Sequence, residues 1–160
     1  MGGSGIDGGN SLEARFAADA ALAPRYVTVL IGANDLTGYP SADAWLNALW
    51  TYVAKWKATG AKVAVGTVLP QCLTQNPTVT AEHAARRTIV NAAIRAAVGG
   101  KIDGVIDFAA DPVMGPDSAA CDRSLYGDGL HPTDGTAGDA NGQGKLSLVY
   151  TAAVETLITR

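Results

Sequence analysis

The stretch YVTVLIGAND, residues 26–35, decides the fold of this chain. Its first seven residues, 26–32, are a continuous β-branched and apolar run, which is typical of a strand buried on both faces. Two similar runs follow, KVAVGTVL at 62–69 and GVIDFA at 104–109. Runs of this kind predict the strands of a parallel sheet.

Helical patterns alternate with these strands. Asn10 is the expected cap of the first helix and Ser41 that of the second, which Gly60 ends. This alternation predicts a three-layer α/β/α fold with a flavodoxin-like parallel sheet, formed by one domain over residues 1–160. The expected helices span residues 10–22, 41–60, 80–100 and 142–159.

Composition bounds the class of protein. The chain has 160 residues and a net charge of -3, with 48% apolar residues. This composition favours a globular domain, and the absence of Lys/Arg clusters argues against nucleic acid or membrane as a partner. Neither a cofactor nor a metal is expected, because two histidines and two cysteines give no metal-ligand spacing. Whether Cys72 and Cys121 form a disulfide or stay free is left open, as is the compartment.

The loop after the first strand is one candidate site. Gly32 allows a sharp turn, and Asn34 can point its side-chain amide into a cleft at the carboxyl end of the sheet. An ordinary strand-ending turn is the alternative, because asparagine and aspartate are common turn residues.

A second candidate lies in YGDGLHPTDG. Asp128 and His131 are three residues apart, so one tight turn places both side chains on the same side. A carboxylate beside an imidazole fixes its tautomer and stabilises its protonated form, as a general base in acyl transfer requires. A surface turn with an incidental histidine is the alternative.

Together, GAND at 32–35 and DGLHP at 128–132 resemble the SGNH, or GDSL, family of esterases and lipases. The glycine-rich segment GGSGIDGGN near the amino terminus fits the second block of that family. The resemblance covers essentially the whole chain. It implies a hydrolase that acts on a small-molecule ester, and we expect short-chain acyl esters as substrates.

The resemblance also implies roles for single residues. Asn34 would donate its amide, and Gly5 its backbone N–H, to an oxyanion hole. His131 would be the base and Asp128 the acid that orients it. An oxyanion donor is commonly worth about 3–4 kcal/mol.

The sequence departs from the family at the nucleophile, because the family's strand ending in Gly-Asp-Ser has no counterpart here. Ser4 is the candidate replacement, since it adjoins Gly5. Ser11 and Ser41 are better explained as helix caps, and Ser124 could approach the site. The alternative is a non-catalytic remnant of the family that binds a ligand or serves as an assembly module.

The missing upstream strands also predict an open sheet edge at residues 26–32. A flat apolar edge invites pairing with another chain. We therefore expect a homodimer joined through this edge, or another element of the same chain that covers it.

Two helix faces carry structural expectations. His83, Arg86 and Arg87 fall on a face predicted to be solvated, with ion pairs of little worth. A core stripe is predicted for the helix at 41–60 from apolar residues at helical spacing, namely Trp45, Leu49, Tyr52, Val53 and Trp56.

Overall fold

A parallel sheet forms the centre of the molecule. The computed structural model describes residues 5–8, 11–74, 77–134 and 142–159. The sheet order is β1-β2-β3, and the β-branched residues stand in register, with Val27 opposite Val63 and Val65 opposite Val105. The strands are β1 (Tyr26–Val29), β2 (Lys62–Gly66) and β3 (Gly104–Ile106).

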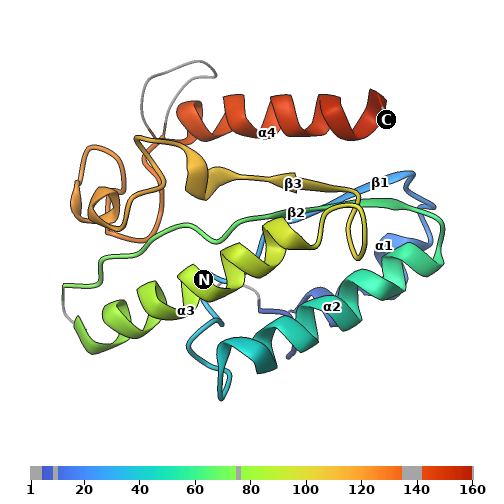
Figure 1. The fold of residues 1–160 in the computed structure, drawn as a ribbon, viewed down its shortest axis with the longest axis horizontal. Coiled ribbons are helices and arrows are strands. Elements are labelled where there is room, and N and C mark those ends of the chain that lie inside the picture. Colours follow the sequence, from blue (N-terminus) through green and yellow to red (C-terminus); the bar gives the residue numbers. More distant parts are fainter. Residues whose placement is uncertain (1–4, 9–10, 75–76, 135–141, 160) are drawn as a thin grey trace.

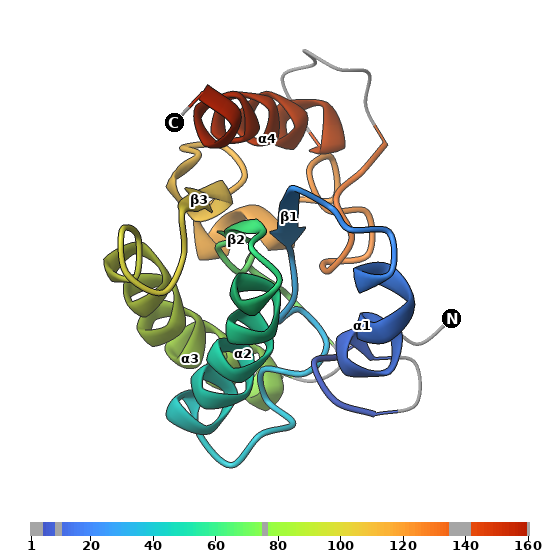
Figure 2. The ribbon, with the colours of Figure 1, turned by 90° about the vertical axis from the view of Figure 1, so that its right-hand side faces the viewer.

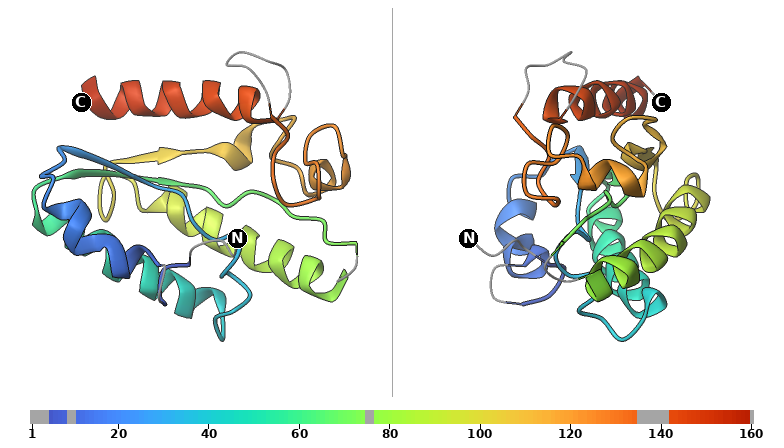
Figure 3. Two further views of the ribbon diagram at one scale, coloured as in Figure 1. Left: turned by 180° about the vertical axis from the view of Figure 1, so that it is seen from behind. Right: turned by 90° about the vertical axis from the view of Figure 1, so that its left-hand side faces the viewer.

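Helices cover both faces of this sheet, which confirms the three-layer α/β architecture (Figure 1). One face carries α1, α2 and α3, and the other carries α4, which packs on β3 and β2. The same layers are seen from behind in Figure 3. The helices are α1 (Leu12–Ala20), α2 (Ala42–Ala58), α3 (Pro77–Ala96) and α4 (Gly142–Thr159), and two short 3₁₀ helices, η1 (Phe108–Ala110) and η2 (Asp117–Cys121), follow β3.

Each face of the sheet has its own apolar core. The predicted stripe of α2, from Trp45 to Trp56, is buried against β1 and β2 as expected. The second core lies under α4, where Phe108, Met114 and Tyr126 pack with Leu146. The loops after β3 are therefore packed against α4 by their own apolar side chains.

The helix ends follow their caps. The Ser11 hydroxyl caps α1 by accepting a hydrogen bond from the Ala14 N–H (3.1 Å), so the cap is Ser11 and not Asn10, which lies outside the described residues. Ser41 caps α2 as predicted, by accepting from the Ala44 N–H (3.1 Å). The expected capping role of both serines is therefore confirmed.

The strands are shorter than the apolar runs that predict them. β1 ends at Val29, and the expectation that residues 26–32 are buried on both faces is wrong. Val29 is buried, but Leu30 is 54% exposed. The reason is position, because β1 is an edge strand with β2 as its only strand partner in the described part of the chain.

Cys72 and Cys121 form a disulfide, which decides the question that the sequence leaves open. The bond joins the loop after β2 to the end of η2. Two of the three loops beyond the carboxyl end of the sheet are therefore covalently linked.

Candidate active site

Asp128 and His131 form a direct pair in the turn that follows η2. Asp128 Oδ2 lies 2.7 Å from His131 Nδ1, and Asp128 Oδ1 accepts hydrogen bonds from the N–H groups of Leu130 (2.9 Å) and His131 (2.7 Å). An ionised carboxylate only accepts, so Nδ1 carries the proton of the neutral ring. Nε2 is then the basic nitrogen, and it belongs to a side chain that is 73% exposed.

The surroundings keep Asp128 ionised. The backbone N–H and imidazole of His131, with the Leu130 N–H, hold the pKa of the Asp128 carboxyl below its usual range. A carboxylate that stays charged can stabilise the imidazolium that forms during acyl transfer.

The turn is also held from outside. The Cys72 N–H donates to the Gly129 carbonyl (2.7 Å), and Gly129 has a φ of +84°. A Cβ at this position would lie 2.2 Å from the Cys72 carbonyl oxygen. Only glycine fits both constraints, so the Asp128–His131 turn is attached to the disulfide-linked loop.

The loop after β1 is shaped by close packing at Gly32. Its φ is +118°, and a Cβ there would lie 2.6 Å from Val68 Cγ2. Three residues later, Asp35 Oδ2 accepts a hydrogen bond from the Ile6 N–H (3.0 Å). Burial raises the pKa of the Asp35 carboxyl. The Asp35 contact brings the segment containing Gly5 against the loop that carries Asn34.

Asn34 and His131 both line a groove of about 610 Å³. It lies between α1, the carboxyl ends of β1 and β2, and α4. Its walls are mostly apolar, as in sites for small organic ligands. The apolar side chains in the lining include Leu12, Leu30, Ile31, Val68, Leu69, Phe108, Leu130 and Leu146.

The other predicted site residues, Gly5, Ser4 and Ser124, are not among the described residues that line the groove. Gly5 is not part of this groove but lies against Asp35, beside a smaller cavity that Asn34 also lines. Ser4 lies outside the described residues. The Ser124 hydroxyl donates to Asp122 (2.7 Å), and Ser124 does not line the groove.

Two hydroxyls of α4, Ser147 and Thr151, do line the groove and were not predicted. The Ser147 hydroxyl donates to the Gly144 carbonyl (2.7 Å) within the helix. A serine or threonine in an amphipathic helix gives no motif, so no sequence signal marks either residue.

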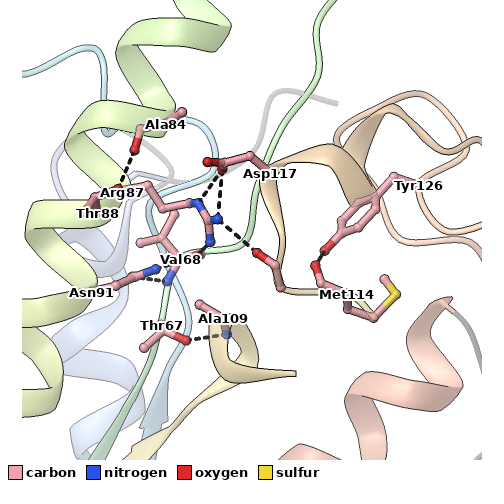
Figure 4. A network of polar contacts seen from close by, with 11 residues as sticks. Thr67, Val68, Ala84, Arg87, Thr88, Asn91, Ala109, Met114, Asp117 and Tyr126 are labelled. Atoms are coloured by element: carbon pink, nitrogen blue, oxygen red, sulfur yellow. Dashed lines mark hydrogen bonds and ion pairs between the residues drawn. The ribbon is translucent and has the colours of Figure 1, made fainter. Parts of the chain in front are cut away.

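A buried polar stripe on α3 corrects the expectation that His83 and Arg87 are solvated. The exposed fractions are 1% for His83, 8% for Arg87 and 3% for Asn91. Arg87 donates to the Gly115 carbonyl (2.9 Å) and pairs with Asp117 (2.8 Å), as Figure 4 shows. Arg86 makes the predicted kind of surface ion pair, with Glu82, and also donates to the Leu36 carbonyl (2.9 Å). A spacing of four residues places His83, Arg87 and Asn91 on one face of the helix, but it does not indicate that this face is buried.

This stripe contacts Val68, one of the residues that line the groove. Asn91 accepts from the Val68 N–H (2.7 Å) and donates to the Val68 carbonyl (3.0 Å), which leaves neither backbone group unpaired (Figure 4). Val68 itself lines the groove and packs against Gly32. The α3 contacts therefore position the loops after β1 and β2.

The burial of His83 predicts an acid-sensitive fold. Burial and, to a smaller extent, the positive charge of the nearby Arg87 lower the pKa of His83 to about 4. The unfolded chain has a histidine pKa of about 6.5 and so binds more protons below that pH. Stability should fall as the pH drops from about 6.5 to about 4, by about 2 kcal/mol at pH 5. Urea unfolding at several pH values measures this loss.

His83→Gln is the control for that prediction, because it removes the titrating group. The variant should lose less stability than the parent protein between pH 7 and pH 5. Equal losses in the two proteins would assign the acid sensitivity to other groups.

The fold and the site together define an α/β protein with an Asp128–His131 pair and an exposed asparagine, Asn34, beyond the carboxyl ends of its parallel strands. The sequence model of the GDSL-like Lipase/Acylhydrolase family matches residues 1–136, and the chain belongs to this family. A search of curated proteins gave no match. Family membership supports an esterase or acylhydrolase function in general terms.

In the part of the chain that the structure describes, no helix combines the length and apolar character needed to cross a bilayer. Within the same residues, no three metal-ligating side chains come together.

Proposed function

We propose that the protein hydrolyses short-chain carboxylic esters by a serine-hydrolase mechanism. The carrying observation is that His131, which is paired with Asp128, lines the same groove as Asn34. Asp128 orients the imidazole, Nε2 accepts a proton, and the Asn34 amide with the Gly5 N–H stabilises the oxyanion.

In the first half-reaction, a hydroxyl gives its proton to His131 Nε2 while its oxygen attacks the ester carbonyl. The tetrahedral oxyanion collapses, and the alcohol leaves with the proton from His131. In the second half-reaction, water gives a proton to the same nitrogen and attacks the acyl-enzyme. The acid is then released and the hydroxyl regains its proton.

Ser4 is the nucleophile that we propose. The support for this assignment is the position of Ser4 in the sequence, next to Gly5. The segment that contains Gly5 contacts the Asn34 loop, because the Ile6 N–H donates to Asp35. Ser4→Ala should then abolish turnover while the fold is preserved. Water activated by His131 would leave turnover unchanged in this variant.

Hydrolysis of p-nitrophenyl acetate and p-nitrophenyl butyrate tests the proposed function. The protein should release p-nitrophenol with saturation kinetics, and butyrate esters should fit the apolar groove. A rate of ester hydrolysis no higher than that of free imidazole at the same concentration would contradict the proposal.

A non-catalytic module is the second candidate function. It is favoured by the hydroxyl of Ser147, a serine of the groove, which donates to the Gly144 carbonyl and not to His131. In that case the groove would bind an ester or other small ligand without turning it over. Ester turnover that disappears in Ser4→Ala would exclude this candidate.

Removal of the Asn34 amide should slow hydrolysis strongly. Asn34→Ala is expected to lower kcat by about 10²–10³-fold, because the donor stabilises charge that develops only in the transition state. KM should change little. Initial rates on p-nitrophenyl butyrate measure both constants.

Asn47→Ala is the matched control, since Asn47 is an exposed asparagine of α2, away from the groove. Its kcat should equal that of the parent protein. Asn34 is itself exposed, so both variants should unfold at the parent urea concentration. Equal kcat values in the two variants would remove Asn34 from the oxyanion hole.

A further inference from the structure

Arg87 of α3 is a buried cation that lies behind the groove and does not line it. Figure 2 shows α3 on the side of the sheet opposite α4, so Arg87 approaches the carboxyl ends of the strands from the face away from α4. The residue is only 8% exposed. A buried charge is costly unless its hydrogen-bonding groups are paired, so the partners of Arg87 fix its place in the fold.

The guanidinium of Arg87 joins two of the loops beyond the carboxyl ends of the strands. Nη1 donates to the Val68 carbonyl in the loop after β2 (3.3 Å). In the segment after β3, Nη2 donates to the Gly115 carbonyl (2.9 Å), and Nη2 and Nε both donate to Asp117 Oδ1 (2.8 Å and 3.2 Å). Because the guanidinium is planar and rigid, these bonds set the separation of the two loops (Figure 4).

The loop after β2 supports the turn that carries Asn34. Val68 packs against Gly32, which lies two residues before Asn34. The contact is too close for a Cβ on Gly32, which would lie 2.6 Å from Val68 Cγ2. Since protein interiors are close-packed, a shift of Val68 moves the Asn34 turn with it.

The segment after β3 supports the turn that begins at Asp128. The hydroxyl of Tyr126, a fully buried residue, donates to the Met114 carbonyl (2.8 Å). Met114 adjoins Gly115, whose carbonyl accepts from Arg87, and Tyr126 lies two residues before Asp128. Figure 4 shows Arg87 and Tyr126 on the two sides of this segment. A shift of the segment therefore moves the turn as well.

We propose that Arg87 is a positioning residue, which sets the His131 imidazole at the correct place relative to the Asn34 amide. This role rests on the proposed function, because the two groups that it aligns are the base and the oxyanion donor of that mechanism. Arg87 acts through the two loops that its guanidinium joins. A misplacement of about 1 Å in such a pair lowers a rate by about 10²-fold.

Arg87→Lys tests this role, because lysine keeps the charge but cannot hold both loops with one planar group. Its kcat on p-nitrophenyl butyrate should fall by about 10-fold to 10²-fold, and its KM should stay close to the parent value. Arg95→Lys is the matched control. Arg95 lies on the same helix and pairs with Asp107 through Nε (2.7 Å) and Nη2 (2.8 Å), and neither residue lines the groove. This control should keep the parent kcat.

Two further variants separate positioning from a general loss of structure. Tyr126→Phe removes only the hydroxyl bonded to Met114 and preserves the packing of the ring, and it should also lower kcat without changing KM. In the Asn34→Ala background the aligned pair is already incomplete, so Arg87→Lys should lower kcat further by only about threefold or less. Multiplication of the two single losses would overturn the role and leave Arg87 with a stabilising function alone.

Hydrogen exchange of the Cys72 N–H tests the link between the loops without any turnover. This group donates to the Gly129 carbonyl (2.7 Å) and so joins the loop after β2 to the Asp128–His131 turn. Its exchange should be about tenfold faster in Arg87→Lys and unchanged in Arg95→Lys. This result in a protein that hydrolyses no ester would contradict the proposed function but support the coupling of the loops. Normal hydrolysis with equal kcat in the two arginine variants would overturn the role of Arg87 and leave the proposed function intact.

Discussion

Replacement of His131 by alanine is expected to lower kcat on p-nitrophenyl butyrate by about 10³–10⁴-fold. The imidazole is the group whose Nε2 is free to accept a proton, because Asp128 occupies Nδ1 at 2.7 Å. KM should stay close to its parent value, since apolar residues of the groove bind the substrate. Steady-state rates separate the two constants, and urea unfolding should be unchanged because the side chain is largely exposed.

Ser124→Ala is the control for this result. Ser124 lies near the same turn, but its hydroxyl donates to Asp122, so kcat should not change. A large loss in Ser124→Ala would make that serine the nucleophile in place of Ser4. Unchanged hydrolysis in His131→Ala would remove the proposed mechanism altogether.

Much of the fold could be predicted because burial on a sheet and periodicity on a helix leave direct marks in the sequence. The apolar runs give the three strands, and the α2 stripe from Trp45 to Trp56 gives a core face. Strand ends could not be predicted in the same way. Leu30 and Ile31 are as apolar as Val29, but β1 ends before them. Apolar character reports burial, whereas strand pairing depends on the neighbouring strand.

The site was predictable where its residues adjoin each other in the chain. Asp128 and His131 are three residues apart, so their contact follows from one turn. The buried stripe of α3 was not predictable from charge alone. Arg87 is buried because the loop at Gly115 and Asp117 folds over it, and that long-range contact leaves no local mark.

Removal of the disulfide is expected to produce the largest loss of stability. The two cysteines are 49 residues apart, and closing a loop of that length in the unfolded chain is worth about 4 kcal/mol. That is a large share of the stability of a typical domain. The Cys72→Ser, Cys121→Ser double variant should therefore unfold at a much lower urea concentration than the parent protein.

The same double variant should also loosen the turn that carries Asp128 and His131. The Cys72 N–H holds the Gly129 carbonyl at 2.7 Å, and Gly129 lies between Asp128 and His131. Hydrolysis should therefore fall on heating before the far-ultraviolet circular dichroism of the helices does, and reduction of the parent protein with dithiothreitol should reproduce both effects. A stability loss below about 1 kcal/mol would mean that the contacts of the two loops, rather than the bond, restrict the chain.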